Sequence, residues 1–293
     1  MIMQIPTSIF VTGGTGNIGG AVARSLLSKG IKVKVLTRNP SSENAIALNN
    51  IGASLIKGNL DDVTSYQDHV ADVDGIFCVL PMEKNKDSEI KKGKDLADLA
   101  VKYKIGHFVY SSVITAGEET NIPHWQSKTV IENYIKSLQL PFTIIRPTSL
   151  YENFLIPQVK KSILKGKLVY PSDGNVVQQH IGAKDIGEIA TKIFLNPRQY
   201  LGQTITVATE QMNLLQVTDL FSKVMHKNMK FQKLPPLITR IFMGKNLYVM
   251  FKWVDQHDMV YVKDINAVHH DFPGLLPLKD WIRFHFEKHR HHA

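Results

Sequence analysis

Three glycines near the N-terminus have the spacing that binds the phosphates of a dinucleotide. Gly13, Gly16 and Gly19 lie in the stretch VTGGTGNIGG, between an apolar run and a segment with helical periodicity. Glycine permits the tight strand-to-helix turn and lets the backbone approach a pyrophosphate. The helix that follows offers free N–H groups and a positive dipole end to the phosphates. The loop predicts a dinucleotide site, whose contacts we assign to Gly13, Thr15, Gly16, Asn17, Ile18 and Gly19.

The residue after the second predicted strand indicates which dinucleotide is bound. An acidic residue at this place would bond the ribose 2′-hydroxyl of NAD, whereas the sequence VLTRNP has Arg38 there. A guanidinium suits a 2′-phosphate by charge and by its forked geometry. An exposed arginine that merely follows a strand is the alternative. We therefore expect NADP (NADPH) as the cofactor, in preference to NAD.

Further cofactor contacts are expected at the carboxyl ends of the strands, because ligands of open α/β sheets bind there. This rule places Asn59 and Leu60 near the adenine, and Leu80 and Pro81 along the middle of the cofactor. Pro147, at the end of the run FTIIRP, is assigned to the same site. Each of these could equally be an ordinary residue at a strand end.

The elements that must position these residues alternate between strand and helix through residue 150. Short β-rich runs alternate with segments of helical spacing. The predicted strands are 8–13, 32–38, 53–60, 74–81, 107–113 and 142–147. The predicted helices between them include 21–30, 90–104 and 124–138. This alternation predicts a doubly wound parallel sheet with helices on both faces. After Pro147 the pattern loosens. We predict an α/β fold with a dinucleotide-binding domain at 1–150 and a smaller, partly interleaved α/β lobe at 151–293.

Composition excludes several classes of protein. The 293 residues carry a net charge of +9, but no zinc-finger spacing, RNA-binding motif or heptad run accompanies it, so nucleic acid is not expected as a partner. No run of 18 apolar residues and no secretory signal is present, so no membrane is expected either. The single cysteine, Cys78, fits a reducing, cytoplasmic setting. The histidine-rich tail lacks a cysteine or carboxylate cluster, and no metal is expected.

Seven segments, in order along the chain, resemble those of a known family. They are GGTGNIGG, LTRNP, GNLDD, KKGKDLADLA, FVYSS, HWQSK and RPTSLYENFL, and they are similar to the NmrA-like group of atypical short-chain dehydrogenases/reductases. The chain looks close to NmrA-like redox-sensor proteins and more distantly similar to quinone and triphenylmethane reductases. The resemblance implies a Rossmann-type domain with a small C-terminal lobe over the cofactor. The family includes both reductases and regulators that bind NAD(P).

The resemblance also suggests which residues would act on a substrate. The wider superfamily uses a Tyr-x-x-x-Lys pair, in which the tyrosine is the acid/base and the lysine holds the ribose. Here His124-Trp-Gln-Ser-Lys128 keeps the lysine and has histidine in the place of tyrosine. We assign Lys128 to the nicotinamide ribose. His124 is a candidate proton donor, and a capping or solvent-facing role at the helix start is the alternative.

Two more positions follow from the same resemblance. Ser112, at the end of the fifth predicted strand, is a candidate to bond the substrate, although Val113 stands where a longer serine run would continue. Asn153, in LYENF, stands where family members approach the nicotinamide, and a helix N-cap is the alternative.

Two functions from different classes are compatible with these residues. The first is an NADPH-dependent reductase of a quinone, a carbonyl or a similar small electrophile. The second is a non-catalytic NADP(H) sensor that acts through a regulatory protein partner. The missing tyrosine favours the sensor, whereas Lys128 serves both functions. Either protein is expected to be a monomer or a homodimer.

Overall fold

The computed structural model describes residues 5–83 and 85–287. Within them the chain divides into two units, each with its own internal contacts. The first unit contains residues 1–147 and 183–206, and the second contains residues 148–182 and 207–293. The chain therefore leaves the first unit after strand β6 and returns to it before completing the second.

A seven-stranded sheet forms the centre of the first unit. Its strands lie in the order β10-β6-β5-β4-β1-β2-β3. Their bounds are β1 Ser8–Val11, β2 Lys32–Thr37, β3 Ser54–Lys57, β4 Gly75–Cys78, β5 His107–Ser111, β6 Phe142–Pro147 and β10 Gln203–Val207. The pairings that join β3, β2, β1, β4, β5 and β6 are all parallel. The parallel sheet predicted from the alternation of strand and helix is confirmed.

The order of the strands reverses at a defined point of the sheet. From β1 the chain moves outward to β2 and β3, then crosses back to β4 on the other side of β1. The ends of β1 and β4 are held together by Thr12, whose hydroxyl donates to the Val79 carbonyl (2.8 Å) and accepts from the Val79 N–H (2.9 Å). Ligands of doubly wound sheets bind at such a reversal of strand order. The glycine loop directly follows β1 and so lies at this point.

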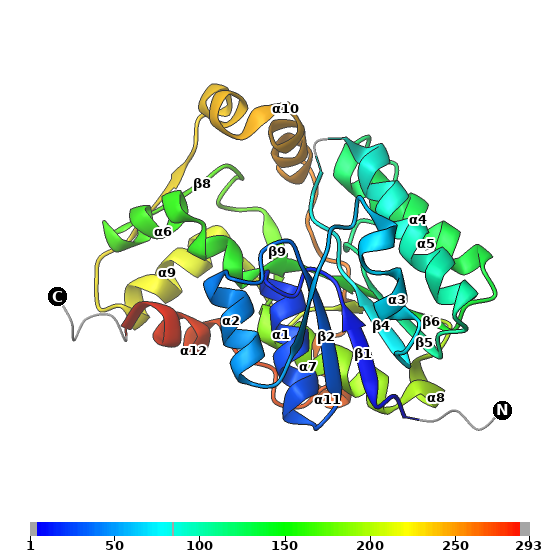
Figure 1. Ribbon diagram of the computed structural model, residues 1–293. Coiled ribbons are helices and arrows are strands. Elements are labelled where there is room, and N and C mark those ends of the chain that lie inside the picture. The colour runs from blue at the N-terminus through cyan, green and yellow to red at the C-terminus, as the bar shows by residue number, and fades with distance from the viewer. Residues whose placement is uncertain (1–4, 84, 288–293) are drawn as a thin grey trace. The chain divides into compact units, whose positions relative to one another are not determined.

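Helices cover both faces of this sheet (Figure 1). They are α1 Asn17–Ser28, α2 Glu43–Asn50, the 3₁₀ turn η1 Val63–Ser65, α3 Gln67–Val70, α4 Lys86–Lys102, α5 Pro123–Ser137, α7 Ala183–Leu195 and α8 Pro197–Tyr200. Helix α1 packs against α7, and α4 packs against α5 and α3. Burying both faces explains why central strands such as β4, with the sequence GIFC, are apolar throughout and fully buried.

The second unit contains two small sheets. One has the order β11-β9-β7 and the other pairs β12 with β8 in parallel. The bounds are β7 Ser149–Leu150, β8 Lys167–Tyr170, β9 Val177–Ile181, β11 Glu210–Asn213 and β12 Lys230–Lys233. These strands have two to five residues, too short to show a period in the sequence. For that reason sequence periodicity did not reveal them.

The helices of the second unit surround an aromatic core. They are the 3₁₀ turn η2 Tyr151–Leu155, α6 Pro157–Leu164, α9 Leu214–Val224, α10 Pro236–Val254, α11 Ile265–Asp271, α12 Leu278–Ile282 and the π-helical turn η3 Arg283–Glu287. Phe154 packs edge-on against Phe221, and Trp281 lies beside both Tyr151 and Phe154. These rings are buried, so the unit has a hydrophobic core of its own.

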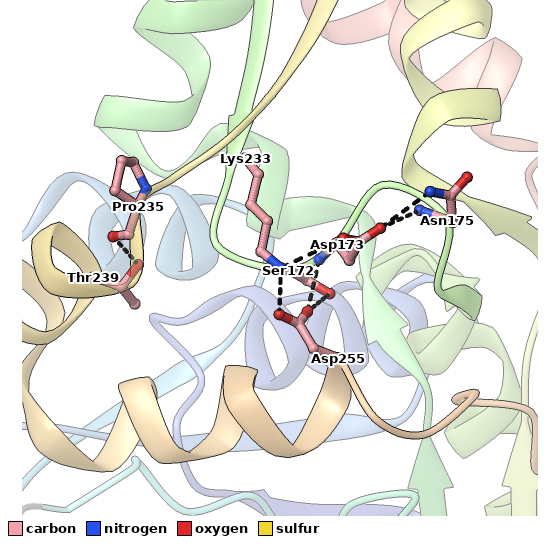
Figure 2. A network of polar contacts seen from close by, with 7 residues as sticks. All are labelled: Ser172, Asp173, Asn175, Lys233, Pro235, Thr239 and Asp255. Atoms are coloured by element: carbon pink, nitrogen blue, oxygen red, sulfur yellow. Dashed lines mark hydrogen bonds and ion pairs between the residues drawn. The ribbon is translucent and has the colours of Figure 1, made fainter.

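A polar network in the second unit joins the C-terminus of α10 to two other segments (Figure 2). The Asp255 carboxylate accepts from the Ser172 hydroxyl (3.1 Å) and the Asp173 N–H (2.7 Å), and pairs with the Lys233 ammonium (2.7 Å). The hydrogen bond to Asp255 raises the pKa of Lys233. The network anchors the second half of α10 to β12 and to the loop after β8.

Among the helices of the described chain, none has the length and apolar character that crossing a bilayer requires.

Burial of His107 makes the stability of the first unit depend on pH. Burial lowers the pKa of His107 to about 4, and its Nε2 lies 2.8 Å from the Thr143 hydroxyl. The unfolded chain protonates near pH 6.5, so it binds more protons than the folded state between pH 4 and 6.5. The contribution of His107 to the free energy of unfolding is therefore fully present above pH 6.5 and decreases as the pH falls below it. Between pH 7 and 5 we expect His107 to account for a loss of about 2 kcal/mol.

The measurement is denaturant unfolding of the wild type and His107→Gln at both pH values. Glutamine keeps an N–H donor for Thr143 but does not titrate, so this variant should lose about 2 kcal/mol less than the wild type between pH 7 and 5. The same replacement at exposed His69, also in the first unit, controls for general effects of the substitution. An equal change in both variants would contradict the assignment to His107.

Candidate functional site

The glycine loop follows β1 and is shaped by close contacts that exclude side chains. Gly13 has a φ of +60°, and a Cβ there would lie 2.8 Å from Val79 Cγ1. A Cβ on Gly19 would lie 2.4 Å from the Gly13 carbonyl oxygen, which is closer than real Cβ contacts allow. The Gly16 N–H donates to the same carbonyl at 2.9 Å. These contacts fold the loop into a tight turn beneath the start of α1.

The N-terminus of α1 is open to an anion. Gly16 is its N-cap, no side chain caps the helix, and no acidic residue lies in its first turn. Its first N–H groups therefore have no partner within the helix and carry the positive end of the dipole. Thr15, Gly16 and Asn17 are at least partly exposed there, as a phosphate site requires.

Arg38 lies at the end of β2, the second strand of the motif. Its side chain is exposed and forms no hydrogen bond or ion pair with any residue that the structure describes. The segment behind it is ordered by local bonds, since the Asn39 N–H donates to Thr37 and the Ser41 N–H donates to Asn39. The guanidinium is thus available to a ligand while the backbone that carries it is held in place.

A side chain that the sequence did not suggest ties this segment to the glycine loop. Asn44, in the first turn of α2, donates its amide to the Thr15 carbonyl at 2.9 Å. Thr15 lies in the glycine loop and Asn44 follows Arg38 by six residues. This bond holds the two predicted phosphate-binding segments together. An asparagine near a helix start usually indicates only a cap, so no local pattern pointed to it.

The other predicted cofactor residues lie at strand ends of the first unit, with different exposures. Leu80 is buried in the core, so its backbone is what remains for a ligand, whereas Leu60 packs against the same core and is partly exposed. Asn59 accepts from the Asp61 N–H (3.2 Å) and forms part of a turn. Pro81 is exposed, and Pro147 is buried at the end of β6. These positions remain predictions as cofactor contacts.

Lys128, on α5, is held by a carboxylate that the sequence reading did not identify. Its ammonium pairs with Glu89 Oε1 at 2.6 Å, and the Ser127 hydroxyl donates to Glu89 Oε2 at 2.6 Å. The Glu89 side chain is 1% exposed and that of Lys128 is 12% exposed. An ammonium has three donors, so the ion pair leaves others for a ribose. The ion pair fixes where those donors lie.

The position of Glu89 on the apolar face of a helix is a sequence pattern that could have identified it as a buried carboxylate. It precedes Gly93, Leu96 and Ala100 at helical spacing, and these residues form the buried face of α4. A carboxylate on such a face needs a buried partner. The helix expected over 90–104 begins one residue after it, whereas α4 begins at Lys86. Because the predicted helix began after Glu89, the residue was not recognised as part of the buried face.

His124 is the second residue of α5, which begins at Pro123 with Ile122 as its N-cap. The histidine therefore does not cap the helix. Burial, together with the positive charge of Lys128, lowers its pKa to about 4. At pH 7 the imidazole is neutral, and its buried Nδ1 has no hydrogen-bond partner among the described residues. The ring can donate a hydrogen bond to a ligand or accept one from it, but only a small fraction of the molecules carry the imidazolium at pH 7.

Several hydroxyls at the carboxyl end of β5 and just after it have no partner among the described residues. The oxygens of Tyr110, Ser111 and Thr115 are buried and form no hydrogen bond with a described residue. Ser112 is also buried; its hydroxyl lies beside the Glu132 carboxylate and helps to lower the pKa of that group, but makes no hydrogen bond of good geometry. Buried polar groups without partners are uncommon in folded proteins. The hydroxyls nearest the strand end, those of Ser111 and Ser112, are candidates to bond a polar ligand, because ligands of open sheets bind there.

A buried ion pair supports this strand end from behind. Glu132, on α5, accepts two bonds from Arg146 of β6, at 2.9 Å and 2.6 Å. Burial raises the pKa of Glu132, but the bonds from Arg146 outweigh it and the pKa lies below its usual value. The carboxylate is therefore charged at neutral pH and fixes α5 against β6.

Asn153 belongs to the second unit. It lies in η2, where its amide donates to the Ser149 hydroxyl at 3.4 Å. The N-caps of η2 and α6 are Leu150 and Ile156, so Asn153 does not cap either. Its role toward the nicotinamide remains a prediction. Tyr151 is buried and donates to Glu210 at 3.1 Å.

The cysteine and the described tail histidine are packed among other side chains of the fold. Cys78 is fully buried in β4, and burial raises the pKa of its thiol to about 12. Within residues 5–83 and 85–287, no group of three histidine, cysteine or acidic side chains is arranged to hold a metal. Of the tail histidines, His285 packs against Trp281, with ring centroids 4.5 Å apart. His289, His291 and His292 lie outside the described residues.

Comparison with known proteins places these features in one family. A model of the NmrA-like family matches residues 6–272. A protein described as an NmrA-like family domain-containing oxidoreductase, from Malbranchea aurantiaca, is 30% identical over 257 residues, covering 77% of this chain and 75% of its own.

Two solved structures have the same fold. NmrA, a negative transcriptional regulator solved in complex with NADP, has a TM-score of 0.79 at 20% identity and covers 98% of both chains. A further NmrA structure contains NAD. Triphenylmethane reductase from Citrobacter sp., solved with NADP(H), has a TM-score of 0.80 at 19% identity and covers 94% of this chain and 99% of its own. These likenesses confirm the Rossmann-type fold.

Proposed function

The chain belongs to the NmrA-like family, and from this premise we propose that it binds NADP(H) and reduces a quinone, a carbonyl or a similar small electrophile. The glycine loop supports cofactor binding, because Cβ atoms at Gly13 and Gly19 would fill the turn. The uncapped start of α1 would hold the pyrophosphate. The NADP complexes of NmrA and triphenylmethane reductase agree with this assignment.

The preference for NADP over NAD rests on Arg38 in this proposal. NmrA was solved with each cofactor, so the fold alone does not choose between them. Arg38 is exposed, unpaired among the described residues, and attached to a segment fixed by Thr37 and Asn39. A guanidinium in this position would bond a 2′-phosphate through two donors.

The observation that carries the reductase is the group of unpartnered buried hydroxyls at the end of β5. A bound nicotinamide cofactor would supply hydride. Ser112 would bond the oxygen of the electrophile, and Lys128 would hold the ribose with the donors that Glu89 leaves free. Neutral His124 would donate an N–H to the developing oxyanion. A quinone suits this set because its reduction needs no strong acid.

A calorimetric titration with NADPH and NADH, followed by a panel of small quinones, tests the proposal. We expect tighter binding of NADPH, and loss of absorbance at the reduced-nicotinamide band when a quinone is added. Binding without oxidation of NADPH across the panel would reject the reductase. Failure to bind either nucleotide would reject the cofactor site as well.

A sensor is the second candidate, and the state of His124 favours it. The resemblance to the wider superfamily implies a tyrosine at this position in a reductase, whereas a histidine with a pKa of about 4 supplies little imidazolium at pH 7. NmrA itself is a transcriptional regulator. In this alternative Lys128 and the glycine loop would serve binding alone, and occupancy would control a protein partner. NADPH binding without turnover is the result that this candidate requires.

His124 can be tested by replacement with alanine. If its N–H stabilises the oxyanion, His124→Ala should lower kcat by about ten- to a hundredfold and leave the affinity for NADPH unchanged. Because the imidazole stays neutral down to a pH of about 4, the wild-type rate should not rise between pH 8 and 6 on its account. Steady-state kinetics with the best quinone measures both effects. An unchanged kcat would remove His124 from the mechanism.

A further inference from the structure

The first half of α10 exposes apolar side chains and buries a polar one. Helix α10 is interrupted at Gly244, where φ is 83° and ψ is 169°, so residues 236–243 form a separate helical segment. Leu237, Ile241 and Phe242 are 68%, 66% and 80% exposed, and Ile238 is also exposed. We call these four residues the apolar face. Thr239, in the same segment, is 2% exposed.

This arrangement reverses the usual pattern of a surface helix. A helix of a globular protein normally turns its apolar side inward and its polar side to water. At 100° per residue, the four residues of the apolar face lie within an arc of about 140°, and Thr239 lies beside this arc, about 60° from Phe242. Thr239 is buried, and its hydroxyl donates to the Pro235 carbonyl at 3.3 Å (Figure 2). A contiguous exposed apolar patch of this kind indicates an interaction surface.

The charge around the apolar face identifies the kind of surface it fits. Helix α10 carries Arg240, Lys245 and Lys252 and has no acidic residue. None of these three cations forms an ion pair with a described residue. From residue 220 to residue 254 the sequence has no aspartate or glutamate at all. The surface is therefore both apolar and positive.

We propose that the apolar face of α10 docks on a membrane surface that contains anionic lipids. Helices that bind such interfaces combine aliphatic and aromatic side chains with lysine and arginine. Leu237, Ile241 and Phe242 enter the acyl boundary, while Arg240 and Lys245 contact the headgroups. A second copy of the chain would bring like charges together, and the phosphates of a nucleic acid offer little to aliphatic side chains.

This docking needs no membrane-spanning segment. The sequence predicted no membrane partner because it has no long apolar run, and that reasoning addresses only segments that cross a bilayer. The exposure of Leu237 and Phe242 is a property of the folded chain. Gly244 allows the segment to differ in direction from the second half of α10, which Asp255 anchors.

Co-sedimentation of the full-length protein with vesicles tests the proposal. We expect binding to phosphatidylcholine vesicles that contain about one third phosphatidylserine, and at least about tenfold weaker binding to phosphatidylcholine alone. Raising the salt from about 0.1 M to about 0.5 M should weaken binding several-fold, because it screens the cations. No sedimentation with the anionic vesicles would overturn the proposal, and equal binding to both lipids would overturn its electrostatic part.

Two double variants separate the apolar face from general surface effects. Leu237→Glu with Phe242→Glu should reduce binding to anionic vesicles by more than about tenfold. The matched control is Leu164→Glu with Phe284→Glu, at positions that are 50% and 57% exposed in the same unit. The control makes the same change of charge and should keep most of the binding. Equal losses in both would contradict a specific role of α10.

Sedimentation velocity over a range of protein concentrations tests whether a second copy of the chain covers the apolar face instead. If the wild type associates and the variant with Leu237→Glu and Phe242→Glu does not, the face is covered by a second copy and the proposal is overturned. A wild type that stays monomeric and binds anionic vesicles supports it. Far-UV circular dichroism and thermal unfolding of both variants establish that the fold is retained, independently of cofactor binding and of the lipid result.

Discussion

Replacing Arg38 with aspartate should weaken NADPH binding by about a hundredfold and leave NADH binding nearly unchanged. The change removes a guanidinium that is free to bond the 2′-phosphate and sets a carboxylate against it. NADH has a hydroxyl at that position, and a carboxylate can accept its hydrogen bond. The ratio of the two dissociation constants, measured by calorimetry, reports the effect.

The control for this change is a neighbouring charge on the same strand. Lys34 lies on β2 and pairs with Asp72, away from the carboxyl end of the strand. Lys34→Asp alters the net charge equally and should not shift the ratio of affinities. If Arg38→Asp weakens NADPH and NADH by the same factor, the 2′-phosphate is bound elsewhere, and the basis for preferring NADP is lost.

Replacing Gly19 with alanine should weaken NADPH and NADH together, by about a hundredfold. The added Cβ would lie 2.4 Å from the Gly13 carbonyl oxygen and 2.7 Å from the Thr12 carbonyl oxygen. Both atoms are backbone, so the turn itself must shift and with it the N–H groups that would bond the pyrophosphate; losing two such bonds, at about 1.4 kcal/mol each, weakens binding about a hundredfold. Calorimetry with both cofactors, beside thermal unfolding, measures the change.

Gly106→Ala is the matched control in the same unit. Gly106 lies between α4 and β5, outside the glycine loop, and its Cβ would lie 3.3 Å from the nearest atom, the Asp74 carbonyl oxygen. This variant should bind both cofactors as the wild type does. A folded Gly19→Ala protein with wild-type affinity would show that the turn does not hold the pyrophosphate. Gly19→Ala tests the phosphate loop, which should affect both cofactors, and Arg38→Asp tests the residue that should distinguish between them.

Sequence alone predicted the features that depend on local order. The strands of the first unit were found within a few residues of their bounds, because a buried parallel strand is an apolar run of recognisable length. The loop from Gly13 to Gly19 was identified because its glycines have a fixed spacing between a strand and a helix. The parallel pairing followed from the alternation of these elements, and family membership followed from the ordered segments.

The tertiary structure decided the features that join distant parts of the chain. Glu89 and Ser127 are 38 positions apart, and nothing near either residue predicts their bond or the pairing of Glu89 with Lys128. His124 stands where a proton donor was expected, but its pKa of about 4 results from burial in the fold. A pattern in the sequence records the type of a residue and not the solvent around it, so no local rule could have supplied this value.

Exposure was likewise beyond the reach of the sequence. The segment 233–259 is rich in aromatic and apolar residues, which favours a hydrophobic core, and Phe251 indeed packs against the core of the second unit. Phe242, nine residues earlier, is 80% exposed. Hydrophobicity predicts that a side chain will leave water, but the surface that receives it can belong to the chain itself or to a partner. In the first half of α10 the structure buries Thr239 and leaves Phe242 exposed, although the two lie three residues apart in one helical segment.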